Sequence, residues 1–409
     1  MSDGRLRIAM ISAHSCPVGT LGAKDTGGMS VYIVELARQL GRQGHVVDAY
    51  TRVHDPDDPV IIELGENARL IHLRAGEDGD IHKLAVYPHL PDFTCNLEAF
   101  RKENGLQYDL VFSHYWLSAW VGQYLEGWWG VPHITMFHTL GAVKNAGGIG
   151  EDEPELRIKT EGELARNCYI IAPTEKEKEN LIQHYGSRPE RISVVPCGVN
   201  MELFQPVDRK AARQRLGLGN GKIVLFVGRI EPLKGVEQLL KAMPLLPNSQ
   251  PVRLVIVGGD ESSQDDVENL QKLSLDLGIK DRVTFTGIKK QEEMPFLYSA
   301  ADVCVVPSYY ESFGLVALES LACGTPVVAT DVGDMKSIIR QGETGFVITD
   351  NEPGNLARKI ALILSRPGMD TESAMATRAS VSRYSWPHIT EAIVRECRLV
   401  LDGYCAPVP

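Results

Sequence analysis

Residues 223–235 read IVLFVGRIEPLKG, five apolar residues followed by a glycine and by a turn that carries Arg229 and Lys234. An apolar run of this length without polar alternation is typical of a strand that is covered on both faces of a parallel sheet. The glycine after it favours a tight turn, and helical spacing resumes over about 234–246. We expect this strand–turn–helix unit to be the building block of the fold.

The same unit recurs along most of the chain. Strands are expected at 8–12, 46–50, 70–73, 110–112, 133–137, 254–257, 303–306 and 327–329, and helices at about 31–40, 264–277, 314–323, 353–365 and 387–401. This alternation predicts the α/β class with doubly wound parallel sheets. The segment 196–221, with its Pro and Gly residues, interrupts it and indicates a domain boundary near residue 200. We therefore expect Rossmann-like domains at 1–200 and 201–385 that face each other across a cleft. A terminal helix within 386–409 is expected to pack back toward the first domain.

Charge and composition limit the classes of function. The chain has 409 residues, 44% of them hydrophobic, and a formal charge of −11, as in a folded globular protein with an acidic surface. Such a surface disfavours nucleic acids and anionic membranes as partners. Eight cysteines show neither CxxC nor zinc-ligand spacing, so buried thiols in a reducing compartment are expected. The first apolar run is too short for a signal peptide and no run reaches the length of a membrane span, so we expect a cytoplasmic protein.

Residues that directly follow strands are the candidates for ligand binding, because ligands of open α/β sheets lie beyond the carboxyl ends of the strands. The motifs GxGxxG and GxxxxGK[ST] are absent, so a dinucleotide dehydrogenase or a P-loop NTPase lacks support. Gly27 and Gly28 precede a helix, where they either let the backbone approach an anion or form an ordinary tight turn. Arg229 and Lys234 suit a diphosphate, the alternative being two surface cations.

The segment 311–319, ESFGLVALE, places carboxylates around a predicted helix start. Glu311 lies in the loop after a strand and Glu319 in the following helix, and both are suited to accept sugar or ribose hydroxyls. The backbone N–H groups from Gly314 to Val316 are suited to bind oxyanions. The alternative is an ordinary capped amphipathic helix.

Histidines follow two further predicted strands. His138 is a candidate functional residue, the alternative being a structural histidine. For His114, in the run His114-Tyr115-Trp116, aromatic packing is an equally good interpretation.

Taken together, these motifs resemble those of the retaining GT-B glycosyltransferases of family 4, also called group 1, over about residues 6–400. The E-x7-E pair of Glu311 and Glu319 is the most specific of them. The resemblance implies a UDP-sugar as donor substrate and donor contacts from Gly27, Gly28, Arg229, Lys234, Glu311, Phe313, Gly314, Leu315, Val316 and Glu319. It implies catalytic roles for His138, Glu311, Arg229 and Lys234. Because the two cations would neutralise the departing UDP, no metal or other cofactor is expected to be required for the chemistry.

Stretches 25–33, 113–118, 138–145 and 311–317 most resemble those members of the family that glycosylate inositol phosphate, and sucrose-phosphate synthases are similar over the same regions. The resemblance implies acceptor contacts from Lys83, Tyr115, Thr139, Lys144, Arg157 and Ser30. The implied reaction moves a hexosyl group, GlcNAc or glucose, to a phosphorylated small acceptor such as inositol phosphate. The alternative within the family is sucrose-phosphate synthesis from UDP-glucose and fructose 6-phosphate.

Two alternatives belong to other functional classes. They are a UDP-sugar 2-epimerase, which needs no acceptor, and a non-catalytic nucleotide-sugar sensor. Only small molecules are expected as partners, apart from a second copy of the chain in a homodimer.

Overall fold

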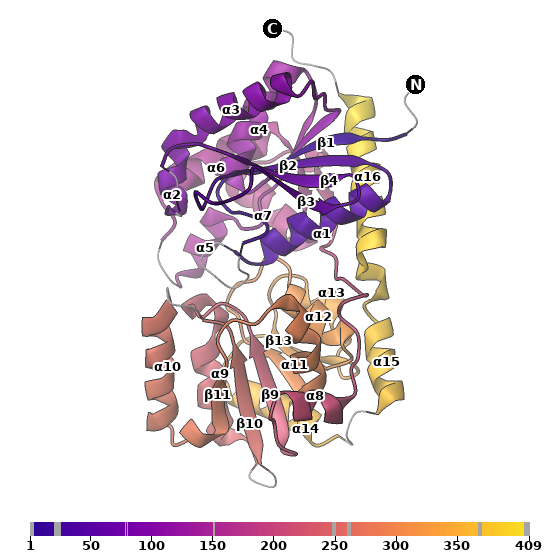
Figure 1. Cartoon of the computed structure of the whole chain (residues 1–409). Helices are drawn as coiled ribbons and strands as arrows, with labels where there is room; N and C mark the ends of the chain where they lie inside the picture. The colour runs from indigo at the N-terminus through magenta and orange to yellow at the C-terminus, as the bar shows by residue number, and fades with distance from the viewer. Residues whose placement is uncertain are drawn as a thin grey trace.

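The computed structural model of the chain describes residues 4–19, 26–77, 79, 81–149, 152–247, 251–259, 263–366 and 370–404. These residues form two α/β halves, one above the other in Figure 1, and the C-terminal helices, coloured yellow, run along one side of both.

An eight-stranded sheet forms the centre of the first half, in the order β3-β4-β2-β1-β5-β6-β7-β8. The strands are β1 Arg7–Ser12, β2 Val46–Arg52, β3 Ile61–Gly65, β4 Ala68–Leu73, β5 Leu110–His114, β6 His133–Met136, β7 Tyr169–Ala172 and β8 Ile192–Val194. All neighbouring strands are parallel except β3 and β4, an edge hairpin that the sequence did not predict. The helices of this half are α1 Gly28–Arg42, α2 Lys83–Val86, α3 Leu90–Glu103, α4 Trp116–Trp129, α5 Gly141–Gly147, α6 Glu155–Asn167 and α7 Glu175–Tyr185.

A six-stranded, fully parallel sheet forms the centre of the second half, in the order β11-β10-β9-β12-β13-β14. Its strands are β9 Lys222–Val227, β10 Val252–Val257, β11 Val283–Phe285, β12 Val303–Val306, β13 Val327–Thr330 and β14 Gly345–Ile348. The helices are α8 Arg209–Arg215, α9 Val236–Ala242, α10 Gln264–Asp276, α11 Met294–Ala300, α12 Leu315–Ala322, α13 Met335–Ile338, α14 Pro353–Leu364, α15 Thr371–Ala379 and α16 Trp386–Gly403. The strand order in both halves confirms the predicted pair of Rossmann-like folds.

The apolar runs of the sequence are the central strands of both sheets. All residues of β5, β12 and β13 are buried, as expected for parallel strands covered on both faces. The edge strand β3 instead alternates between exposed and less exposed residues, because only one of its sides pairs with another strand.

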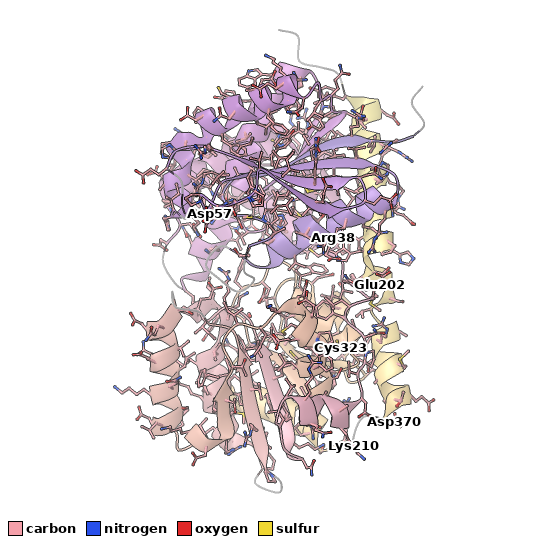
Figure 2. The ribbon with its side chains drawn as sticks, in the orientation of Figure 1. Arg38, Asp57, Glu202, Lys210, Cys323 and Asp370 are labelled. Carbon is pink, nitrogen blue, oxygen red and sulfur yellow. The ribbon has the colours of Figure 1, made fainter. Side chains whose placement is uncertain are left out.

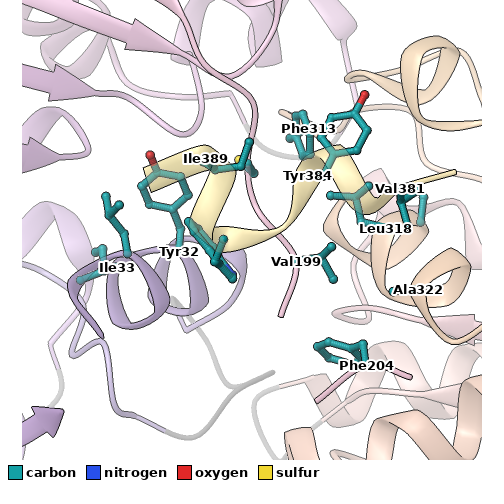
Figure 3. Packing of buried hydrophobic residues seen from close by; sticks show 14 of the residues in the cluster. Tyr32, Ile33, Val199, Phe204, Phe313, Leu318, Ala322, Val381, Tyr384 and Ile389 are labelled. Atoms are coloured by element: carbon teal, nitrogen blue, oxygen red, sulfur yellow. The ribbon is translucent and has the colours of Figure 1, made fainter. Parts of the chain in front are cut away.

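The chain passes between the two halves twice, and the two passages lie side by side. Val199 pairs with Ser385 in a parallel bridge, and its N–H donates to the carbonyl of Tyr384 at 2.8 Å. Beyond this point α16 packs on α1, where the ring centroids of Tyr32 and Trp386 are 5.3 Å apart. Figure 3 shows Tyr32 of α1 beside α16, with the side chains of the second half continuing the same apolar cluster. One hydrophobic core therefore spans both halves.

Many charged side chains lie at the outer surface, whereas most of the described thiols are buried. Figure 2 shows Lys210 and Asp370 at the outer surface of the second half, where both are exposed, whereas Cys323 is only 2% exposed. Of the cysteines in the described ranges, all are free and only Cys95 is exposed. Cys405 lies outside those ranges.

Candidate active site

A cavity of about 420 Å³ lies between the carboxyl ends of the strands of the two sheets. Loops that follow β5, β6, β9, β10 and β12 all contribute to its lining. The site residues expected from the sequence that line it are His138, Gly27, Gly28, Arg229, Lys234, Glu311, Phe313, Gly314, Leu315, Val316, Glu319, Lys83, Tyr115, Thr139, Lys144 and Arg157. Residues expected to touch two different substrates thus surround one space.

Ser30 is the exception among the expected site residues. Its side chain is fully buried on α1, its hydroxyl lies 3.4 Å from that of Ser15, and it does not line the cavity. The register of the helix turns this position toward the end of β1, away from the cavity lining, and the acceptor contact of Ser30 stays a prediction.

Strained backbone accompanies the site in the first half. Tyr115 and His138, the residues that follow β5 and β6 closely, have φ angles of 77° and 61°. Residues other than glycine adopt this left-handed conformation at a cost of about 1–3 kcal/mol and do so mostly at functional sites. With this backbone conformation, both residues line the cavity.

His138 and His114 form an imidazole pair in which His114 is fully buried and His138 is half-buried. Nε2 of His138 lies 3.0 Å from Nδ1 of His114. Burial lowers the pKa of His138 to about 3 and also lowers the pKa of His114, so both rings are neutral at physiological pH. His114, for which the sequence left packing and function open, therefore orients the ring of His138.

Arg157 is the most buried cation of the cavity, with 1% of its side chain exposed. Its Nη2 donates to the carbonyl and to the hydroxyl of Thr139, both at 2.9 Å, and its guanidinium carbon lies 4.9 Å from the centre of the Tyr115 ring. Its Nε pairs with Oε1 of Glu161 at 2.6 Å. These contacts fix the guanidinium at the cavity wall.

Glu153 was not expected from the sequence, yet it is the carboxylate on which three cations of the first half converge. Its Oε1 lies 2.8 Å from Nη1 of Arg157 and 4.0 Å from Nζ of Lys83, and it also pairs with Nζ of Lys144. Burial raises the pKa of Glu153, but the three cations outweigh it and lower the pKa to about 2. The group is therefore ionised at neutral pH.

Arg229 and Lys234, the two cations of the turn after β9, each have a separate carboxylate. Nη2 of Arg229 lies 3.1 Å from Oε1 of Glu231, and Nζ of Lys234 lies 2.7 Å from Oε1 of Glu311. The hydroxyl of Ser308 also donates to this oxygen of Glu311 at 2.9 Å. The turn after β9 and the loop after β12 are thus joined by an ion pair.

Glu319 lies in α12, behind the start of that helix. Its Oε2 accepts a hydrogen bond of 2.7 Å from the hydroxyl of Tyr298, and burial raises its pKa to about 7. Gly314 precedes α12 with a φ of 124°, and a Cβ there would lie 2.6 Å from Cε of Met335. Glycine is therefore required at the point where the backbone turns into the helix.

The two walls of the cavity touch at two places. A Cβ on Gly28 would lie 3.1 Å from Cδ1 of Leu315, so the glycine lets α1 and α12 approach. On the other side, the N–H of Leu140 lies 3.4 Å from the hydroxyl of Tyr310 and donates to it.

Sequence reasoning missed further lining residues: His14, Tyr32 and Tyr310. His14 stacks at 4.4 Å on the ring of Tyr115, and its place just after β1 is a signal that could have identified it. Tyr32 lies within an apolar helix pattern that carries no such signal.

The described ranges contain no group of three or more His, Cys, Asp or Glu side chains placed to hold a metal ion. In the same ranges, no helix combines the length and the apolar character needed to cross a bilayer.

Comparison with known proteins defines the class. Residues 208–381 match the family model for glycosyl transferases group 1, and residues 26–203 match that for Glycosyltransferase Family 4. The chain belongs to the group 1 glycosyltransferases and is an enzyme that transfers a hexosyl group from a nucleotide-sugar.

Three individual proteins are similar to this chain over most of its length. The chain is 38% identical over 369 residues to D-inositol 3-phosphate glycosyltransferase of Corynebacterium glutamicum, covering 88% of each chain. It is 39% identical over 401 residues to the protein of the same name from Acidothermus cellulolyticus, covering 95% of this chain and 89% of that one. Among solved structures, sucrose-phosphate synthase from Thermosynechococcus elongatus superposes with a TM-score of 0.88 at 34% identity, covering 98% of this chain and all of that one.

Proposed function

We propose that this protein transfers GlcNAc or glucose from a UDP-sugar to a phosphorylated polyol or sugar, with inositol phosphate as the first candidate acceptor. One observation carries the proposal: a single cavity contains two separate sets of cations, one on each wall. Lys83, Lys144 and Arg157 lie on the first half, and Arg229 and Lys234 lie on the second. Two phosphate-bearing substrates that meet between the domains would each find one set.

The donor is assigned to the second domain, 201–385. Arg229 and Lys234 bind the diphosphate and neutralise the charge that develops on the departing UDP. Glu319 accepts the ribose hydroxyls, while Glu311 and the backbone from Phe313 to Val316 hold the hydroxyls of the donor sugar. Gly27 and Gly28 of the first domain leave room for the diphosphate. With two cations in this role, the chemistry is proposed to need no metal ion.

The sugar is transferred with retention of configuration through an oxocarbenium-like state. His138 is neutral, so it contacts the donor sugar without adding positive charge to that state. Its backbone carbonyl is available to stabilise the positive charge at the anomeric carbon. Closure of the two domains excludes water and limits hydrolysis of the donor.

The acceptor is assigned to the first domain, 1–200. Arg157, Lys144 and Lys83 bind its phosphate, assisted by the hydroxyls of Tyr115 and Thr139. The names of the relatives support a phosphorylated acceptor, inositol 3-phosphate in one case and the precursor of sucrose phosphate in the other. Sucrose-phosphate synthesis is therefore the second candidate function, favoured by the structural match over 98% of the chain.

A screen for UDP release tests the proposal. UDP-GlcNAc and UDP-glucose are each incubated with inositol phosphate, fructose 6-phosphate, inositol or fructose, with and without a chelator. We expect release only with a phosphorylated acceptor and no loss with the chelator. Equal UDP release with phosphorylated and unphosphorylated acceptors would overturn the acceptor assignment. Donor alone serves as a control, since formation of an epimer would indicate a UDP-sugar 2-epimerase instead.

Two further predictions from the sequence concern the protein as a whole. A cytoplasmic location and a homodimer are both proposed, and light scattering during gel filtration tests the second.

A further inference from the structure

Three cations of the proposed phosphate site share one oxygen atom of one carboxylate. Oε1 of Glu153 takes the contacts from Arg157, Lys144 and Lys83 that would otherwise be open to a ligand anion. The Glu153 side chain is 6% exposed and does not itself line the cavity, whereas the three cations that it holds do. A carboxylate oxygen and a phosphate oxygen attract the same donors.

The position of Glu153 is fixed by a dedicated side chain. The backbone N–H of Glu153 donates to Oδ1 of Asn145 at 2.7 Å, and Nδ2 of Asn145 donates to the Glu153 carbonyl at 3.0 Å. Asn145 is the neighbour of Lys144 on α5. Both backbone groups are thereby held while the carboxylate itself is held only by the cations.

A second carboxylate in the cluster is held much more firmly. Glu161 lies within α6, is fully buried, and accepts from Nε of Arg157, from the N–H of Gly141 at 2.9 Å and from the hydroxyl of Tyr185. Glu153 precedes α6 and lies in a loop. Of the two, Glu153 is the one whose carboxylate can rotate away without losing hydrogen bonds from a backbone N–H and a tyrosine hydroxyl.

Charge balance favours an exchange of Glu153 for phosphate. With Glu153 in place, three cations face two carboxylates, which leaves one positive charge. If a phosphate with a charge near −2 replaces Glu153, the cluster becomes neutral. A phosphate also has three terminal oxygens with which to reach the cations and the hydroxyls of Tyr115 and Thr139 together.

We propose that Glu153 is a specificity-determining residue that takes up the hydrogen-bond donors of the three cations and gives them up to the phosphate of the acceptor. The inference rests on the proposed function in that the acceptor carries a phosphate. A neutral acceptor cannot displace the carboxylate, and a monovalent anion replaces it without any gain in charge. The site therefore selects a dianionic phosphate over both.

Binding of inorganic phosphate tests this without any turnover. Phosphate is titrated calorimetrically, at constant ionic strength, into the wild type, Glu153→Gln and Glu155→Gln, the last being an exposed carboxylate of the same segment. The Glu153→Gln protein should bind phosphate about tenfold more tightly, since a competing charge is gone, and Glu155→Gln should bind as the wild type does. Adding Lys144→Gln to Glu153→Gln should remove the gain, which assigns the phosphate to this cluster.

Thermal unfolding provides the second measurement. Glu153→Gln leaves the buried Arg157 with one partner fewer, so its Tm should fall without phosphate and rise more than that of the wild type when phosphate is added. Glu153→Asp keeps the charge and is the substitute if the first variant does not fold; its shorter side chain should give an intermediate affinity.

Equal or weaker phosphate binding by Glu153→Gln and Glu153→Asp would overturn the inference and identify Glu153 as a support for the cations. Failure of the proposed function would show itself differently, as an absence of phosphate-dependent UDP release in the wild type.

Discussion

The two walls of the cavity assemble their cations in opposite ways. On the acceptor side, Lys83, Lys144 and Arg157 come from α2, α5 and α6 and converge on a single carboxylate. On the donor side, Arg229 and Lys234 come from one turn after β9, and each pairs with a carboxylate of its own. Tertiary folding brings together the three cations of the first half, whereas the two cations of the second half are already close in the sequence.

Glu153 and Glu319, one carboxylate from each half, differ in pKa. Glu153 lies among three cations that lower its pKa to about 2, in spite of its burial. Burial raises the pKa of Glu319 to about 7, and a tyrosine hydroxyl is its hydrogen-bond partner. One carboxylate is thus always charged and can act as a counter-ion, while the other changes charge near neutrality. The comparison indicates that the three cations of the first half have counter-ions before any ligand arrives, although one positive charge of the cluster remains.

The largest effect is expected from the donor-side cations. Arg229→Ala and Lys234→Ala should each lower kcat/KM by roughly 30- to 1000-fold, because a charge-assisted contact to the leaving group is worth about 2–4 kcal/mol in the transition state. Steady-state UDP release measures the loss.

Lys241→Ala is the matched control, since Lys241 belongs to an exposed pair with Glu237 in the neighbouring helix α9. If turnover is unchanged in both Arg229→Ala and Lys234→Ala, these two residues do not stabilise the leaving group.

A smaller effect is expected from Glu319, and it depends on pH. The folded-state pKa, about 7, lies above the ordinary value of 4.5, so the folded protein binds this proton more tightly than the unfolded chain does. Relative to Glu319→Gln, the wild type should gain about 2 kcal/mol of stability as the pH falls from 7 to 4.5, and the difference should then level off.

Urea unfolding at several pH values measures this difference, with the exposed Glu352→Gln as control. A constant difference between wild type and Glu319→Gln across this range would mean that Glu319 does not titrate near neutrality.

The smallest effect is expected from Lys144, whose side chain is 20% exposed. Lys144→Ala should lower kcat/KM about tenfold for phosphorylated acceptors and leave unphosphorylated ones nearly unchanged, because one charge-assisted contact of about 1.4 kcal/mol is lost. Lys159→Ala, an exposed position of α6, should change neither. Equal losses for both kinds of acceptor would refute a phosphate-specific role.

The same contrast explains which parts of the molecule could be predicted. The apolar runs of β5, β9 and β12 identify the parallel sheets, because burial on both faces leaves a signal within a few residues. The edge strand β3 has no such signal, since one side of it faces solvent. The donor wall was equally accessible to prediction, because Arg229 and Lys234 are five residues apart.

The position of Glu153 could not be predicted from the sequence. Glu153 is one of several acidic residues in the segment 151–155, EDEPE, and nothing local distinguishes it. Its position depends on the amide of Asn145 and on cations from three separate helices. The burial of Ser30 could not be predicted for a related reason, because the rotation of α1 about its axis is set by packing. Contacts of this kind exist only after the chain has folded.

The course of α16 has a consequence for protein synthesis. Trp386 and Ile389 pack with Tyr32 of α1 in one apolar cluster, and a Cβ on Gly198 would lie 2.5 Å from the Trp386 ring. A ribosome delivers α1 first and α16 last, so the nascent first half emerges with this apolar strip uncovered while the entire second half is still being made. The strip on α1 can therefore be covered only after α16 has been made, which leaves apolar surface exposed to solvent throughout synthesis of the second half.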